Sequence, residues 1–192
     1  MPPKLVTAPE VRALTVAAVK QNLRIAHDDD HDLLLSLIDA VTSLLDGPFG
    51  VLRNCLLDQV WEVRGPDWRS ARLNLGNVQS IEQATYWPPD ATEAVTLDPD
   101  AYRLADDAQG AVLVLADGLR PELALRRDAI SVRFKAGYGP SADTVPAAVR
   151  QAMQLLVGHF YKHSEAVITG TRPTELPMGV RALLAPYRLQ RV

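Results

Sequence analysis

The sequence has very little cysteine, since Cys55 is the only one in 192 residues. A single cysteine excludes an internal disulfide and any metal cluster built on several thiolates, and it fits a protein that matures in a reducing cytoplasm. Isolated cysteines are usually buried and inert, and no strong basic partner is evident near this one. We therefore predict no redox or nucleophilic role for Cys55.

Long apolar runs are also missing. No stretch approaches the roughly 18 consecutive apolar residues of a membrane-spanning helix. The start of the chain, Met-Pro-Pro-Lys, opens no apolar run of signal-peptide length. We expect neither a membrane protein nor one exported through a signal peptide.

A strong net charge is missing as well. The formal net charge is −3, which does not provide the concentrated basic face that duplex DNA binding normally needs. Charge is nevertheless unevenly distributed. Residues 27–46 contain six aspartates and no lysine or arginine, whereas residues 120–135 and 166–192 are both locally basic.

The sequence does have enough apolar residues for a core, at 47% of the chain. At this length we expect a single domain spanning residues 1–192. Its clearest helix covers residues 145–165, where Pro146 suits the first turn. The apolar stripe of this helix follows steps of four and three residues, as in a helix that faces a core. Five residues are expected to be among the most buried: Leu37, Val41, Val149, Met153 and Leu156.

Three further helices are predicted near 15–25 and 30–46 and, as a short piece, over 179–185. Between them, residues 56–137 alternate apolar and polar positions in short runs separated by Gly, Pro, Asn and Asp, which is typical of antiparallel strands. The predicted fold class is therefore α+β, a helical core with a β-rich insert. Residues 1–13, with three prolines, are expected to form an extended N-terminal arm, and 167–192 a C-terminal tail.

Two histidine pairs have the spacing of metal ligands on one helix face: His27 with His31, and His159 with His163. Neither pair has an evident third ligand, and the second lacks the glutamate of a zinc protease helix. No phosphate-binding glycine loop and no Gly-x-Ser-x-Gly motif occurs. We therefore predict no catalytic residue, no metal site and no cofactor.

Several runs of sequence, taken in order, resemble one family. They are Leu-Thr-Val-Ala-Ala-Val-Lys-Gln-Asn-Leu-Arg-Ile near the start, Gln59-Val-Trp-Glu-Val, Asn77-Val-Gln-Ser-Ile, Leu97-Asp-Pro-Asp-Ala-Tyr-Arg-Leu, Val132-Arg-Phe-Lys-Ala-Gly-Tyr-Gly, the run from Val145 to Tyr161 and the run from Leu176 to Arg188. The chain resembles the head-tail connector proteins, also called adaptor or head completion proteins, of long-tailed bacteriophages and gene transfer agents. No single run is diagnostic of the family. The order and spacing of the runs carry the resemblance, which extends over residues 14–188.

The resemblance implies a structural adaptor and not an enzyme. Such subunits form a ring beneath the portal protein, a dodecamer if it matches the portal's symmetry, and join the portal to a stopper or tail component. DNA passes through the channel of the ring without sequence-specific binding, and the protein resides at the head-tail junction of the particle. The sequence does not distinguish a phage from a gene transfer agent.

Two alternatives from other classes stay open. A nucleic-acid-binding module would show salt-dependent binding to duplex DNA. A metal-dependent hydrolase would carry a stoichiometric transition metal on His159 and His163.

Two sets of site residues are predicted. The resemblance implies that the C-terminus reaches the portal, and its mix of aromatic, apolar and arginine residues suits protein docking. The tail from Tyr187 to Val192 is therefore expected to lie away from its own core, with portal-binding residues Tyr187, Arg188, Leu189 and Arg191. Complementary charge predicts a subunit interface formed by Asp28, Asp29 and Asp30 of one subunit and Arg126 and Arg127 of the next.

Overall fold

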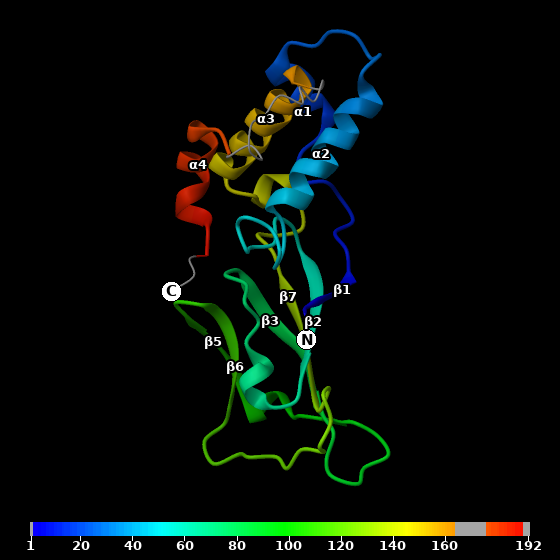
Figure 1. The fold of residues 1–192 in the computed structure, drawn as a ribbon, viewed down its shortest axis with the longest axis vertical. Coiled ribbons are helices and arrows are strands. Elements are labelled where there is room, and N and C mark those ends of the chain that lie inside the picture. The colour runs from blue at the N-terminus through cyan, green and yellow to red at the C-terminus, as the bar shows by residue number, and fades with distance from the viewer. Residues whose placement is uncertain (1, 164–175, 190–192) are drawn as a thin grey trace, which may run out of the picture.

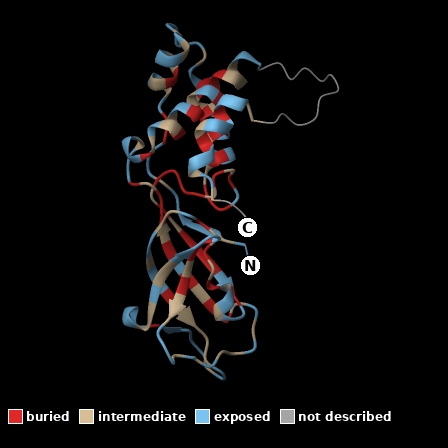
Figure 2. Ribbon diagram, turned by 90° about the vertical axis from the view of Figure 1, so that its left-hand side faces the viewer, coloured by how far each residue is buried: buried red, intermediate tan, exposed pale blue. Residues whose placement is uncertain are grey.

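The computed structural model describes residues 2–163 and 176–189, which form a helical half and a β half arranged along the longest axis (Figure 1). The helical half contains α1 (Val16–Leu23), α2 (His31–Leu45), α3 (Ala147–Lys162) and α4 (Met178–Leu184), the last followed by the 3₁₀ turn Ala185–Tyr187. Most of the β half comes from the segment between α2 and α3. The predicted α+β fold, with a β-rich insert in a helical core, is confirmed. Buried residues fill the interior of both halves (Figure 2).

Helix α3 is the centre of the helical half. It begins after Pro146, whose φ of −51° suits the entry to a helix, and it continues for 16 residues. Val149, Met153 and Leu156 are fully or almost fully buried, as predicted. The helix contacts α1, α2 and α4, so its apolar stripe organises the packing of the other three.

Helix α2 confirms one core residue and corrects another. Its inward stripe consists of Leu34, Ile38, Val41 and Leu45, each with 0% exposure. Leu37 is only half-buried, and its prediction as one of the most buried residues is wrong. It lies one residue from Ile38, about 100° around the helix, and so occupies the flank of the stripe.

A glycine lies where α1 and α3 pack together. A Cβ atom at Gly158 would lie 2.8 Å from Cδ2 of Leu23, at the end of that side chain, so Leu23 would have to shift to accept a larger residue. At the other end of α1, the Thr15 side chain accepts a hydrogen bond from the Ala18 amide and caps the helix.

The larger sheet has five antiparallel strands in the order β1-β2-β7-β3-β4. These strands are β1 (Lys4–Thr7), β2 (Gln59–Gly65), β7 (Ile130–Ala136), β3 (Val78–Tyr86) and β4 (Val95–Thr96). In the β2–β7 register Trp61 faces Phe134 and Val63 faces Val132. All four side chains are buried and belong to the core of the β half.

The smaller sheet is a hairpin of β5 (Tyr102–Asp107) and β6 (Gly110–Leu115). It is joined to the segment before β3, because Leu73 donates a 2.8 Å hydrogen bond to the Ala111 carbonyl and Ala111 donates a 2.9 Å hydrogen bond to the Leu75 carbonyl. Leu73, Leu75 and Ala111 are completely buried. The hairpin therefore covers the same core that the larger sheet encloses.

The N-terminal arm is extended, as expected for residues 1–13, but it does not stand free. Lys4–Thr7 forms β1 at the edge of the larger sheet, where Leu5 pairs with Trp61 of β2. The arm then leads to Ala13 and Leu14, which are buried in the helical core. The arm thus contributes to both halves of its own subunit.

No helix in residues 2–163 and 176–189 is long and apolar enough to cross a membrane.

Candidate functional site

A chain of polar contacts joins the helical half to the β half. Asp46, the residue that ends α2, accepts hydrogen bonds from the Leu56 amide at 2.6 Å and from Nε2 of Gln59 at 3.1 and 3.0 Å. Gln59 in turn accepts a 3.1 Å hydrogen bond from the Trp61 indole. Burial raises the pKa of Asp46, and these hydrogen bonds offset only part of that rise. The contacts fix where the first strand of the insert leaves the helices.

Two asparagines complete this junction between the helical half and the β half. Asn77 pairs with the main chain of Cys55 in both directions, accepting from its amide at 2.9 Å and donating to its carbonyl at 2.6 Å. Asn54 donates to the Tyr138 hydroxyl at 3.3 Å and to the Tyr187 carbonyl at 2.7 Å. The second bond attaches the segment after α4 to the junction.

Residues 187–189 pack on their own subunit, which corrects this part of the prediction that Tyr187 to Val192 lies away from the core, and residues 190–192 lie outside the described residues. Tyr187 packs against the helical core, and the Leu189 amide donates a 3.0 Å hydrogen bond to the Leu52 carbonyl. The Leu189 side chain reaches the backbone at Gly76 and Gly110, where added Cβ atoms would lie 3.6 and 3.0 Å from it. Tyr187 and Leu189 thus pack at the subunit's own junction.

Portal binding by the predicted residues is a separate question and stays a prediction. Arg188 is exposed and Leu189 is half-buried. Arg191 lies outside the described residues.

A groove of about 780 Å³ lies beside this segment, between the loop after α2 and the helix α4. Its wall includes three arginines, Arg53, Arg181 and Arg188, and none of its lining residues in the described part of the chain is acidic. Phe49 also lines the groove and is 73% exposed. An exposed aromatic side chain among arginines is typical of a protein docking surface. Sequence reasoning identified Arg188 but missed Phe49 and Arg53, because only the fold brings the loop next to α4.

The acidic segment before and within α2 is partly paired inside the subunit. Asp28 forms an ion pair with Lys20, and Asp30 accepts a hydrogen bond from the Tyr161 hydroxyl. The Lys20 ammonium lowers the pKa of Asp28. Asp29 contacts only His27, at 3.7 Å, among the ion pairs of the described residues, and its side chain is 93% exposed.

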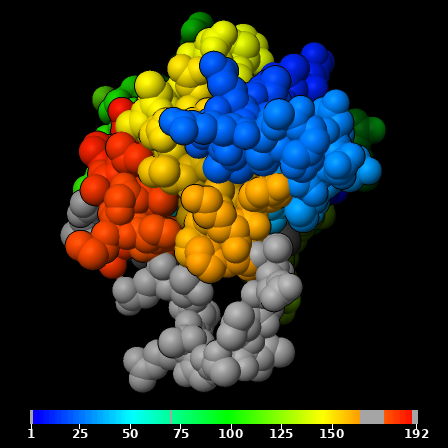
Figure 3. All heavy atoms as spheres, turned by 90° about the horizontal axis from the view of Figure 1, so that it is seen from above, coloured from blue at the N-terminus to red at the C-terminus, as the bar shows by residue number. Residues whose placement is uncertain are grey.

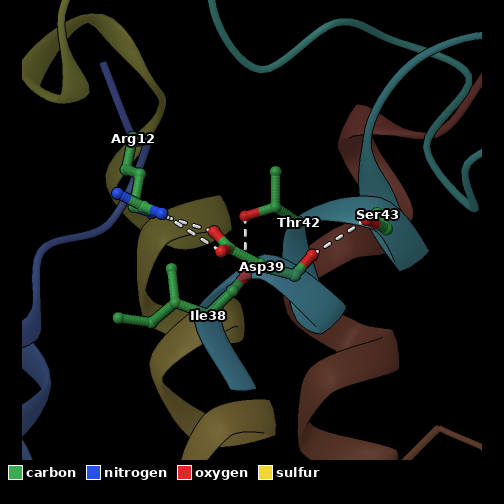
Figure 4. A network of polar contacts seen from close by, with 5 residues as sticks. All are labelled: Arg12, Ile38, Asp39, Thr42 and Ser43. Carbon is green, nitrogen blue, oxygen red and sulfur yellow. Dashed lines mark hydrogen bonds and ion pairs between the residues drawn. The ribbon is translucent and has the colours of Figure 1, made fainter. Parts of the chain in front are cut away.

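Further along α2, Asp39 holds the N-terminal arm to the helix. Both carboxylate oxygens of Asp39 accept hydrogen bonds from Arg12, at 2.9 and 3.1 Å (Figure 4). This pairing lowers the pKa of Asp39. Thr42 and Ser43 donate to the main-chain carbonyls of Ile38 and Asp39, within α2 itself.

The predicted basic partner of the acidic segment lies at the opposite end of the molecule. The loop between α1 and α2 is at the helical end of the long axis, whereas the loop between β6 and β7 is at the β end (Figure 1). In that second loop Arg126 pairs with Asp128 at 2.7 Å and lies 4.0 Å above the Trp87 ring. Arg127 is exposed. The predicted interface therefore requires neighbouring subunits to meet head to tail along their long axes.

Among the described residues, neither histidine pair has a further metal ligand beside it. In α3 the rings of His159 and His163 are 4.6 Å apart, and a His163 ring nitrogen lies 2.8 Å from the His159 carbonyl. Within residues 2–163 and 176–189 no group of three or more His, Cys, Asp or Glu side chains is placed to hold a metal. Burial and the Asp46 charge raise the pKa of the Cys55 thiol, which disfavours the reactive thiolate.

Comparison with known proteins identifies the fold. No protein family model and no curated protein sequence matches the chain. Solved structures do match, each over 100% of this chain and 97% of the other chain. Two of them have a TM-score of 0.76: a chain of the neck of an empty gene transfer agent (GTA) particle computed with C6 symmetry, at 22% sequence identity, and a chain of the virion of a native gene transfer agent particle, at 23% identity. A chain of the neck of a native GTA particle computed with C12 symmetry has a TM-score of 0.69 and 22% identity. The sequence resemblance is thereby confirmed at the level of the fold, which this chain shares with chains of gene transfer agent particles.

Proposed function

We propose that this chain is a structural adaptor subunit of the head-tail connector of a gene transfer agent or a related tailed phage. It forms a ring beneath the portal protein and joins the portal to the stopper or tail component. The observation that carries the proposal is the fold agreement with neck chains over 100% of this chain and 97% of each neck chain. Agreement at both ends matters because it includes the helical half, the β half and the order in which they are joined.

The ring is proposed to contain twelve subunits. One related neck was computed with C12 symmetry and another with C6, and sixfold symmetry is contained within twelvefold symmetry. A closed ring needs a heterologous interface, in which two different faces of each subunit meet. The central channel of such a ring would let DNA pass without sequence-specific contacts.

The proposed role is architectural and needs no catalytic residue or cofactor. The ordered polar contacts of the described residues, centred on Asp46, Asn54 and Asn77, connect parts of the fold and are largely buried. A groove lined by arginines lies on the surface of the described chain and suits a protein partner.

Loss of the chain tests the proposal. Deleting its gene from a particle-producing genome should leave DNA-packaging heads and separate tails that fail to join. Supplying the wild-type chain in trans should restore tailed particles, and a Leu155→Ala chain, altered only at an exposed α3 position, should restore them equally. Normal numbers of infectious or transfer-competent particles without the chain would contradict the proposal.

A further inference from the structure

The groove and the start of α2 have opposite charge. The groove presents Arg53 and Arg188, with no acidic lining residue among those described. The start of α2 presents Asp28 and Asp29, with side chains each 93% exposed, and the exposed Asp32. The two surfaces are therefore complementary in charge.

The two surfaces also match in their apolar content. Phe49, at the groove, is 73% exposed, and Leu33, directly after Asp32, is 39% exposed. Each surface therefore combines charge with one apolar side chain that its own subunit leaves partly open to solvent. Such a pairing buries apolar area while the surrounding charges set the register.

The two surfaces lie on opposite sides of the helical half. Helix α4, one wall of the groove, is on one side and the start of α2 is on the other, both in the side view and from above, and the start of α2 is also farther from the β half than the groove (Figures 1 and 3). They cannot meet within one subunit. Contact between two different faces on opposite sides of a subunit is the arrangement that closes a ring.

We propose that the groove of one subunit receives the acidic start of α2 from a second copy of the chain, with Phe49 against Leu33 and Asp29 and Asp32 facing Arg53 and Arg188. The proposal rests on the ring function proposed above and assigns its subunit interface. It gives the acidic segment a partner in the helical half, instead of Arg126 and Arg127 at the β end.

Mixed-disulfide formation between purified full-length chains tests this contact. Chains carrying Phe49→Cys are mixed with chains carrying Leu33→Cys, and disulfide-linked dimers are measured under mild oxidation. The matched control replaces Phe49→Cys with Leu125→Cys, because Leu125 is fully exposed and adjoins Arg126. We expect the first mixture to exceed the control by at least about tenfold, the change in an equilibrium constant that about 1.4 kcal/mol produces. Equal yields, or a higher yield with Leu125→Cys, would overturn the proposal, the latter in favour of the Arg126 and Arg127 pairing.

A charge exchange gives a second readout. Adding Arg53→Glu and Arg188→Glu to the Phe49→Cys chain should reduce the mixed dimer to the control level. Adding Asp29→Arg and Asp32→Arg to its partner should then restore it, because the charges are opposite again. A yield of mixed dimer that neither set of substitutions alters contradicts the proposal.

The two proposals fail separately. If the chain forms a neck ring in the particle but this disulfide does not form, only the interface assignment is wrong. If the disulfide forms but the chain is absent from the neck, the proposed function is wrong.

Discussion

Asn54 donates a 2.7 Å hydrogen bond from its side-chain amide to the main-chain carbonyl of Tyr187. The two residues are 133 positions apart, and the bond ties the segment after α4 to the junction between the helical and β halves. A Cβ atom at Gly76 would lie 2.5 Å from Oδ1 of Asn54, so the backbone at Gly76 passes close to this side chain. The segment up to Leu189 is therefore part of the fold.

Deleting residues 187–192 should consequently lower the thermal stability of the subunit. The sharper test is Leu189→Ala, which should reduce the free energy of unfolding by about 1–3 kcal/mol because the side chain packs at the junction. Arg188→Ala, next to it but exposed, should change that free energy by less than about 0.5 kcal/mol. Denaturant unfolding of both variants measures the difference, and equal stabilities would mean that the segment is not packed.

Truncating Leu156 to Ala should cost about 2–5 kcal/mol, through lost transfer free energy and the cavity left in the helical core. Leu156 is 1% exposed, whereas the adjacent Leu155 is 41% exposed. Leu155→Ala is therefore the matched control and should cost far less. A loss below about 0.5 kcal/mol for Leu156→Ala would show that α3 buries a different face.

The sequence predicted the helical half well because its signal is local. The stripe through Val149, Met153 and Leu156 repeats with the period of a helix and is long enough to be unambiguous. The phase of α2 was harder, because a helix with neighbouring leucines such as Leu34 and Leu37 offers two overlapping apolar faces. Packing against α3 selects the one through Leu34 and leaves Leu37 on the flank.

The contacts between distant segments could not be predicted from sequence. Nothing local indicates that Lys4–Thr7 pairs with β2, or that Leu189 fills a space next to Gly76 and Gly110. The composition of residues 187–189 is equally suited to an internal anchor and to a docking tail. The groove was missed for the same reason, since Phe49 and Arg188 lie far apart in the chain.

Glu62 should make stability depend on pH. It is 6% exposed as a residue and accepts hydrogen bonds from Arg64 at 2.8 Å and Arg133 at 3.1 Å. Burial alone would raise the pKa of Glu62, but these bonds and one from Ser131 outweigh it and hold the pKa below the ordinary value of 4.5. A group whose pKa is lowered in the folded state contributes its full stabilisation at pH values above its ordinary pKa. That stabilisation is lost as the pH falls through the folded-state pKa.

Glu62→Gln should therefore destabilise the protein by about 1–3 kcal/mol at pH 7, towards the lower end because both arginines are half exposed. The difference from wild type should shrink as pH falls below 4.5. Glu82→Gln, at an exposed position of β3, is the control and should show no comparable loss. A pH-independent difference for Glu62→Gln would indicate a packing effect instead of a charge effect.

Arg127→Glu tests the interface predicted from sequence more cleanly than changing Arg126 as well. Arg126 already pairs with Asp128 and covers the Trp87 ring, so Arg126→Glu disturbs its own subunit. If Arg127 faces the acidic segment of a neighbour, its reversal should lower ring yield, measured by sedimentation, while circular dichroism stays unchanged. Wild-type ring yield would remove Arg127 from the interface.

A cryo-electron microscopy reconstruction of the particle neck, without imposed symmetry, tests the central claim most directly. The account predicts a ring of twelve copies directly beneath the portal, each density fitted by the helical and β halves as they are joined here, with the next tail component attached below. A complete neck in which no density matches this fold would contradict it.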